Sequence, residues 1–173
     1  MTASISPSVA IRPAVVDDLA AIREIYRHYV ENTVATFDYE TPSLDDWRAK
    51  LAAITEAGRP FLVADSVDDG VVGFAYLGEF RAKAAYAKTT EDTIYVRQGL
   101  GGRGLGSSLL SAVVEQADPD NVTQIVAVIA AESGDGSIAL HRRYGFAEVG
   151  RLAKVGRKFD RWIDVVYLQR EIN

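Results

Sequence analysis

Cysteine is absent from the 173-residue chain, and histidine occurs only twice, at His28 and His141. Without cysteine there can be no disulfide, no thiolate metal site and no cysteine nucleophile. Two histidines are also too few for an ordinary histidine-based zinc site. We therefore expect no bound metal.

Positive charge is scarce as well. The 24 aspartates and glutamates outnumber the 19 lysines and arginines, which gives a formal net charge of −5. A mildly acidic surface repels phosphate unless basic residues gather in one patch, and here they are spread out apart from a modest cluster in the last quarter. A nucleic-acid partner is therefore not expected.

Long apolar runs are missing too. No stretch reaches the roughly 18 consecutive apolar residues that a membrane-spanning helix needs. Residues 1–9 lack the basic and apolar regions of a signal peptide. Since there is also no repeat, low-complexity tract or linker, we expect one domain over residues 1–173, in the cytoplasm and without membrane contact.

What is present is an alternation of helical and extended patterns. Asp17 and Asp18 precede apolar residues spaced by three and four, which predicts a first helix. Ser43 followed by Asp46 resembles a capping box and predicts a second helix, which Gly58 ends. Two further helices are expected, over residues 109–114 and 137–144.

Extended patterns fill most of the remaining chain. They predict strands at residues 9–12, 61–64, 71–77, 94–96, 122–131, 146–152 and 164–168. Their order relative to the helices predicts an α/β mixture with both hairpins and helical crossovers.

One segment is unusually rich in glycine. Residues 97–108 read R-Q-G-L-G-G-R-G-L-G-S-S, with five glycines in the eight residues 99–106. They follow an expected strand and precede an expected helix. Glycines allow several backbone N–H groups to point toward one place, and the helix N-terminus adds partial positive charge there. The segment therefore predicts a binding site for an anion such as a phosphate ester.

Three other interpretations fit this segment less well. A plain structural turn does not need so many glycines. A dinucleotide-binding fingerprint needs an acidic residue about 20 positions on, after a second strand, but Asp118 and Asp120 precede that strand. A P-loop ends in Gly-Lys-Ser/Thr, whereas Gly106 is followed directly by Ser107.

The segment resembles the acetyl-CoA motif of the GNAT family of N-acetyltransferases, commonly written Q/R-x-x-G-x-G/A. Its six positions fall on residues 101–106, with Gly101 where glutamine or arginine is usual. Downstream, S-I-A-L-H-R-R-Y-G-F at residues 137–146 is similar to the last helix and turn of the family. The resemblance extends over nearly the whole chain.

Other segments narrow the resemblance to one branch, the phosphinothricin and methionine sulfoximine N-acetyltransferases. They are T-V-A-T-F-D-Y-E-T-P (33–42), F-R-A-K-A-A-Y-A-K-T-T-E-D-T-I-Y-V (80–96) and V-G-R-K-F-D-R-W-I-D-V (155–165). The resemblance implies a GNAT fold, with a mixed, mostly antiparallel twisted sheet of six to seven strands flanked by about four helices. It also implies a homodimer that transfers acetyl from acetyl-CoA to the α-amine of a small amino acid or analogue.

The resemblance further implies which residues form the site. Those expected to bind acetyl-CoA are Ile94, Tyr95, Val96, Gly101, Gly102, Arg103, Gly104, Leu105, Gly106, Ser107, Asp135 and His141. Those expected to bind the amino acid are Phe37, Arg81, Tyr86 and Glu91. A cation at Arg81 would suit a carboxylate or phosphinate oxygen. Phe37 is either a wall of this pocket or part of the core.

Two residues are expected to be catalytic. Glu91 matches the general base of the branch, because a substrate ammonium must lose a proton before its nitrogen attacks a thioester. Its alternative is a solvated glutamate at a strand edge. His141 falls where the family often places tyrosine or histidine near the sulfur of CoA, and it would donate a hydrogen bond or a proton to the leaving thiolate. Its alternative is packing or capping. Since no cysteine can carry an acyl group, we expect direct transfer.

Two other functions stay open at this point. One is a GNAT acetyltransferase with another acceptor, such as a polyamine, and the other is a non-catalytic acyl-CoA-binding sensor. The basic residues of the last quarter are expected to form a solvated strand-and-turn face that also lines a dimer surface. They are Arg151, Lys154, Arg157, Lys158 and Arg161.

Overall fold

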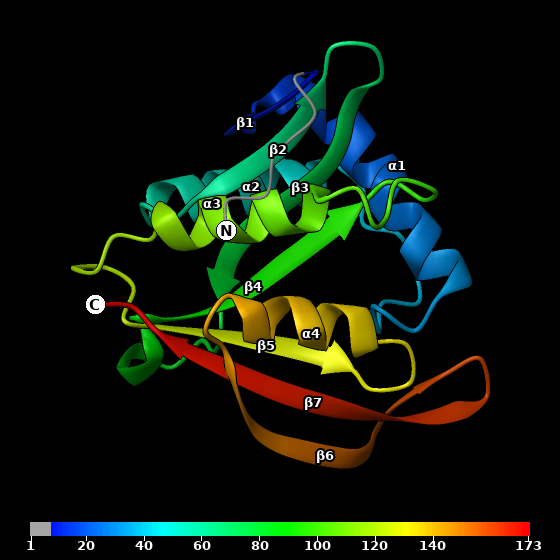
Figure 1. Cartoon of the computed structure of the whole chain (residues 1–173), viewed down its shortest axis with the longest axis vertical. Coiled ribbons are helices and arrows are strands. Elements are labelled where there is room, and N and C mark those ends of the chain that lie inside the picture. The colour runs from blue at the N-terminus through cyan, green and yellow to red at the C-terminus, as the bar shows by residue number, and fades with distance from the viewer. Residues whose placement is uncertain (1–7) are drawn as a thin grey trace.

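The computed structural model describes residues 8–173, so the expectation about the first few residues lies mostly outside it. Its centre is a seven-stranded sheet in the order β1-β2-β3-β4-β5-β7-β6 (Figure 1). Every neighbouring pair is antiparallel except β4 and β5, which run parallel. The strands are β1 (Val9–Pro13), β2 (Phe61–Ser66), β3 (Gly70–Glu79), β4 (Thr89–Val96), β5 (Gln124–Ala130), β6 (Ala147–Lys158) and β7 (Arg161–Glu171).

Four α-helices flank this sheet, which confirms the expected fold class. They are α1 (Leu19–Asn32), α2 (Leu44–Glu56), α3 (Leu105–Glu115) and α4 (Asp135–Arg143). Two short 3₁₀ helices, η1 (Val16–Asp18) and η2 (Ala84–Tyr86), complete the elements. In Figure 1, α3 and α4 cover the face toward the viewer, and α1 and α2 lie behind the sheet.

Each face of the sheet carries its own apolar core. On the α1 and α2 face, Trp47 and Phe74 pack edge to face with 5.6 Å between ring centroids. On the α3 face, Leu109 and Leu110 are fully buried, and α3 packs mainly on β2, β3 and β4. Burying a side chain of this size contributes about 1.5–3 kcal/mol, so these cores hold the helices on the sheet.

Local signals in the sequence explain most element ends. The Ser43 capping box is confirmed: Ser43 Oγ accepts from the Asp46 amide at 3.1 Å, and Asp46 Oδ2 accepts from the Ser43 amide at 2.8 Å. Gly145 follows α4 with φ +80°, the left-handed conformation that glycine adopts most easily after a helix.

Three strand predictions were clearly too short. The strand expected at 94–96 begins at Thr89, so Glu91 lies inside β4 and not before it. The last two strands extend to a two-residue turn at Phe159 and Asp160, with φ values of +50° and +57°. A phenylalanine is an unusual residue at such a position, and the sequence therefore gave no turn signal there.

The feature of the fold that creates a site is the separation of β4 from β5. The two strands pair only between Thr89–Glu91 and Gln124–Val126, although both continue well beyond these residues. In Figure 1 their arrowheads diverge, with α3 lying over one side of the gap and α4 over the other. Toward their carboxyl ends, β4 and β5 therefore have no backbone pairing with each other.

Candidate active site

A cavity of about 580 Å³ occupies the gap between β4 and β5. Its size is in the ordinary range for small-molecule sites. The structure brings together in its wall these predicted residues: Phe37, Glu91, Ile94, Tyr95, Val96, Gly106 and His141. Segments that are far apart in the sequence thus meet at one place.

Other predicted residues lie outside the cavity wall. Leu105 is buried in the core under α3, and Asp135 is exposed between Gly134 and Gly136, which do line the cavity. The remaining ones belong to the glycine loop, to the first turn of α3 or to the exposed β3–β4 connection. They are Gly101, Gly102, Arg103, Gly104, Ser107, Arg81 and Tyr86.

The backbone of β4 has free hydrogen-bonding groups toward the gap. The Arg97 amide donates to the Val72 carbonyl at 2.8 Å. In an antiparallel pair every second residue bonds to the partner strand, so Tyr95, two residues before Arg97, also directs its backbone groups toward β3. The residues that alternate with these, Ile94 and Val96, direct their N–H and C=O groups toward β5, which has moved away. Tyr29 already uses one of these groups, because its hydroxyl donates to the Val96 carbonyl at 2.5 Å.

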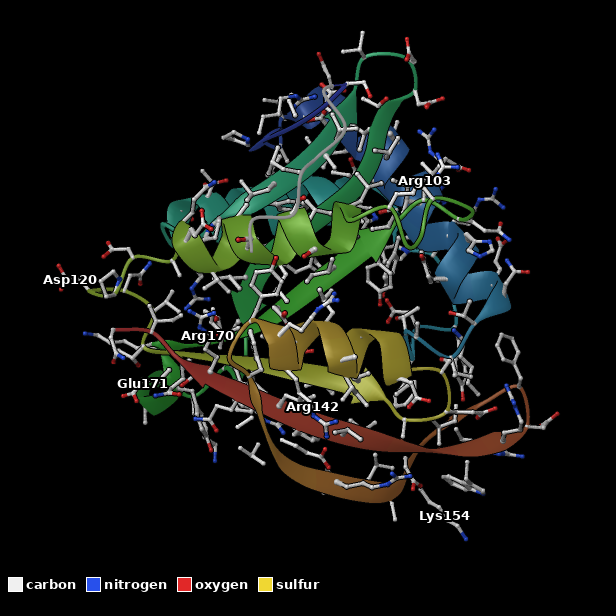
Figure 2. All side chains as sticks on the ribbon, viewed as in Figure 1. Arg103, Asp120, Arg142, Lys154, Arg170 and Glu171 are labelled. Atoms are coloured by element: carbon white, nitrogen blue, oxygen red, sulfur yellow. The ribbon has the colours of Figure 1, made fainter. Side chains whose placement is uncertain are left out.

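The glycine loop places a helix N-terminus beside the same gap. Gly104 precedes α3 with φ +81°, and the first helical bond runs from the Ser108 amide to the Gly104 carbonyl at 2.9 Å. The amides of Leu105, Gly106 and Ser107 come before that bond and stay available to an anion. Figure 2 shows Arg103 on this loop, at the end of α3 that faces the opening.

Glu91 is half-buried on the face of β4 that α1 and α2 cover. Its register partner on β3 is Gly78, and the Tyr76 ring leans over that glycine. Burial raises the pKa of Glu91, the charge of Asp92 raises it further, and Arg81 and Lys50 oppose the shift without cancelling it. A carboxylate with a raised pKa is a stronger proton acceptor than an exposed glutamate.

His141 lies on the opposite face, where α4 meets β4. Its Nε2 is 2.7 Å from Asp92 Oδ2, and its Nδ1 is 2.7 Å from the Ser137 carbonyl oxygen. Burial opposes a charged ring, but the hydrogen bond and charge of Asp92, together with the Ser137 carbonyl, raise the pKa of His141 above its usual value. Since both ring nitrogens face acceptors, the imidazolium form satisfies the site best.

Two cations lie close enough to Glu91 to affect its carboxyl group. Lys50 Nζ donates to the Tyr76 hydroxyl at 3.2 Å and lies over the Trp47 ring, 5.1 Å from its centroid. Arg81 lies over the Phe80 ring at 5.2 Å. Within residues 8–173, neither cation has a carboxylate within 4.0 Å, so both can meet an anionic ligand.

Sequence reasoning missed several residues of the cavity wall. Tyr26 and Tyr29 were assigned to the apolar face of the first helix, but they also carry hydroxyls that reach the cavity. Thr36 directly precedes the predicted Phe37 and Asp92 directly follows the predicted Glu91, yet no spacing signal distinguished either residue. Helical periodicity identifies which side of a helix is inward, but it does not separate a core from a cavity.

Within the part of the chain that the structure describes, no helix is both long and apolar enough to cross a membrane. Over the same residues, no cluster of three or more histidine, aspartate or glutamate side chains has an arrangement that suits a metal ion.

Comparison with known proteins agrees with this geometry. A model of the acetyltransferase (GNAT) domain matches residues 11–167. Phosphinothricin N-acetyltransferase from Alcaligenes faecalis is 37% identical over 157 residues, which cover 91% of this chain and 79% of that protein. L-methionine sulfoximine/L-methionine sulfone acetyltransferase from Pseudomonas paraeruginosa is 38% identical over 167 residues, or 96% of each chain.

A solved structure is similar over the same length. It is a GNAT superfamily phosphinothricin acetyltransferase from Sinorhizobium meliloti in complex with AcCoA, with a TM-score of 0.90 and 37% identity. The match covers 96% of this chain and 89% of that one. The resemblance found in the sequence is thereby confirmed, and the chain belongs to the GNAT family of acetyltransferases.

Proposed function

We propose that the chain is an acetyl-CoA-dependent N-acetyltransferase that acetylates the α-amine of a small amino acid or analogue. The acceptor is of the phosphinothricin, methionine sulfoximine or methionine sulfone type. The observation that carries the proposal is the half-buried Glu91, with its raised pKa, in the wall of the cavity between β4 and β5. The names of similar proteins support this acceptor class.

The described residues fit acetyl-CoA as the donor. The amides of Leu105, Gly106 and Ser107 at the start of α3 would bind its pyrophosphate. The N–H and C=O groups of Ile94 and Val96 that face the gap would bind the amide-containing arm, as an added strand does. The related S. meliloti structure contains this ligand.

The reaction is direct transfer from thioester to amine. Glu91 accepts the proton of the acceptor's ammonium, directly or through water, and the free amine nitrogen attacks the thioester carbonyl carbon. As the carbon–sulfur bond breaks, the nitrogen loses its second proton through water, and the departing thiolate takes up a proton, so that CoA leaves as the thiol. An N–H of β4 that faces the gap would donate to the thioester oxygen while negative charge develops on it.

In this proposal His141 does not act as a proton donor. Both of its ring nitrogens are already bonded, to Asp92 and to the Ser137 carbonyl. Giving a proton to the thiolate would break one of these bonds in a buried site. We assign His141 to holding α4 against β4, which is the packing alternative for this residue.

Charge near Glu91 favours an acidic acceptor over a polyamine. Arg81 and Lys50 both lie close enough to affect the Glu91 carboxyl, and both suit a carboxylate or a phosphinate oxygen. A polyamine would bring positive charge toward these two cations. The acceptor's own carboxylate is the natural partner of Arg81.

Two further expectations belong to this proposal. One is that the whole unit works as a single acetyltransferase domain in the cytoplasm. The other is a homodimer: β6 is an edge strand, and its exposed side chains include Val149, Leu152 and Val155. Apolar side chains on an open edge favour pairing with a second copy. Light scattering after size-exclusion chromatography measures the mass, and a monomer at micromolar concentration would contradict the dimer.

A thiol-release assay tests the function directly. The protein is incubated with acetyl-CoA and one acceptor at a time: phosphinothricin, methionine sulfoximine, methionine sulfone, other free amino acids, or spermidine. We expect turnover with at least one of the first three and none with spermidine. Turnover with spermidine alone would overturn the acceptor class. Acetyl-CoA binding without turnover on any amine would indicate a sensor instead.

A further inference from the structure

Lys158 is a buried lysine that the proposed chemistry does not use. The sequence placed it on a solvated basic face, but this is wrong, because the residue is only 4% exposed at the inner side of β6. Lysine is almost never buried to this extent without a partner. Its Nζ donates to the Thr36 carbonyl at 2.8 Å. Burial lowers the pKa of Lys158, and the charge of Asp38 opposes that shift.

The carbonyl that Lys158 binds belongs to the loop between α1 and α2. Thr36 and the next residue, Phe37, both line the cavity. The other side of this loop is held by Tyr26, whose hydroxyl lies 2.6 Å from Thr36 Oγ1 and donates to Asp38 Oδ2 at 2.7 Å. The loop is thus fixed between α1 and the end of the β6–β7 hairpin.

The same hairpin also supports the ring of Phe37. Gly156 lies two residues before Lys158 on the same inner face, and a Cβ added there would collide with that ring. Beside it, the Tyr39 hydroxyl donates to the Arg157 carbonyl. Three consecutive hairpin residues therefore contact the loop, and the space for the Phe37 ring exists only because residue 156 has no side chain.

The loop borders the acceptor side of the cavity. The Tyr95 hydroxyl donates to the Ala35 carbonyl at 3.2 Å, and Tyr95 shares a face of β4 with Glu91. The helix N-terminus assigned to the pyrophosphate of acetyl-CoA lies at α3, on the other face of the sheet. A displaced loop would therefore alter the place of the amine acceptor and leave the pyrophosphate site unchanged.

We propose that Lys158 is a positioning residue that sets acceptor affinity, by holding Thr36 and Phe37 against the cavity through its bond to the Thr36 carbonyl. Gly156 is the second half of this device, since it accommodates the Phe37 ring. The inference rests on the proposed function for its kinetic consequence, whereas its structural consequence is independent of that function.

The principal variant is Lys158→Met, which removes the ammonium and keeps an unbranched apolar stem. We expect the KM for the amino-acid acceptor to rise roughly tenfold, the scale of one lost hydrogen bond to a charged group, while the KM for acetyl-CoA stays within twofold. Lys154→Met is the matched control, because Lys154 is exposed on the same strand and projects away from the sheet (Figure 2). An equal rise in both KM values, or none, would overturn the proposal.

A second variant covers the case in which Lys158→Met does not fold. Gly156→Ala pushes the Phe37 ring from its place, so it should also raise the acceptor KM selectively. In a Phe37→Ala background the added effect of Gly156→Ala should vanish, because the ring it displaces is gone. Additive effects in this double-mutant cycle would contradict the assigned contact and the proposal with it.

Hydrogen exchange separates this inference from the proposed function. Lys158→Met, or Gly156→Ala if the first variant does not fold, should speed amide exchange in residues 33–40 and leave the α3 amides unchanged. That result is expected whether or not any acceptor is turned over. Unchanged exchange in residues 33–40 would overturn the inference even in an active enzyme, whereas a wild-type protein without turnover would overturn only the function.

Discussion

Asp92 on β4 and His141 on α4 form a buried pair across the gap in the sheet. The Asp92 Oδ2 to His141 Nε2 distance is 2.7 Å, and the two side chains are 3% and 5% exposed. Backbone pairing between β4 and β5 ends one residue earlier, at Glu91. The pair therefore begins where the sheet's own hydrogen bonds stop, and it joins the two sides of the cavity.

Because of this pair, the free energy of unfolding should fall as the pH rises. The pKa of His141 is raised in the folded protein, so its contribution is fully present below the unfolded value of about 6.5 and is lost as pH rises through the folded value. We expect the free energy of unfolding in urea to decrease between pH 6.5 and pH 9. Removing one partner of a buried pair costs about 3–5 kcal/mol, so Asp92→Asn should lose that amount at pH 6 and less at pH 9.

The other histidine provides the control for this measurement. His28 packs edge to face on Tyr29, with 5.3 Å between ring centroids, and His28→Gln should retain the wild-type slope of stability against pH. If Asp92→Asn retained that slope as well, the pair would not be its source.

Replacing Glu91 tests the assignment of the base. Glu91→Gln keeps the shape of the side chain and removes the proton acceptor, so kcat should fall about 10²–10⁴-fold. The Kd for acetyl-CoA, measured by calorimetry, should stay the same.

In the wild type, kcat/KM should decline as pH falls through the Glu91 pKa, which lies above the ordinary 4.5. Glu56→Gln, at the exposed end of α2, is the control. A variant at Glu91 with near wild-type kcat would mean that another group takes the proton.

The sequence was most informative where local chemistry decides the structure. The capping residue Ser43 and the terminating Gly58, with φ +66°, act within one turn of the backbone, and the sequence predicted both correctly. The alternation of helices and strands follows from apolar periodicity, and the family resemblance supplied the rest of the fold class. These signals do not depend on contacts between residues that are far apart in the sequence.

The cavity depends on long-range contacts, and these were only partly predictable. Lys158 and Thr36 are 122 residues apart, and nothing in the basic run that includes Lys158 shows that one member turns inward. Asp92 and His141, whose side chains are hydrogen-bonded, are 49 residues apart in the sequence. Glu91 and Phe37 were found through resemblance, because in isolation a strand glutamate and a loop phenylalanine have ordinary explanations.

The glycine loop gives a prediction about donor binding. Gly104 has φ +81°, and a Cβ added there meets nothing within 4 Å, so Gly104→Ala acts through backbone strain alone. That strain is about 1–2 kcal/mol for an L-residue. We expect the Kd for acetyl-CoA to rise roughly tenfold as the loop relaxes away from its anion-binding form. Gly150→Ala is the control, because Gly150 is exposed, meets nothing within 4 Å and has no positive φ. Equal affinities in the two variants would remove the loop from the donor site.

The last prediction concerns Asp18, which the sequence assigned only to the start of a helix. Its carboxylate accepts from Arg12 Nη1 at 2.7 Å and Nη2 at 2.8 Å, and also from the Val15 amide at 2.8 Å. The hydrogen bonds from Arg12 lower the pKa of Asp18, and the Val15 amide adds to this against the effect of burial. Asp18 therefore joins β1 to the beginning of α1, behind the sheet.

A lowered carboxyl pKa contributes stability that is present above the unfolded value of 3.8 and is lost as pH falls through the folded value. Asp18→Asn keeps the size of the side chain but loses the charge, so it should cost about 2–3 kcal/mol at pH 7, the scale of hydrogen bonds to charged groups. The cost should shrink toward pH 3, where the wild type is losing the same contribution. Asp17→Asn, at the exposed neighbouring position, should change little at either pH. Urea unfolding of the wild type and the two variants at pH 7 and pH 3 measures these costs. If the cost of Asp18→Asn did not depend on pH, the shape of the side chain and not its charge would be what residue 18 contributes.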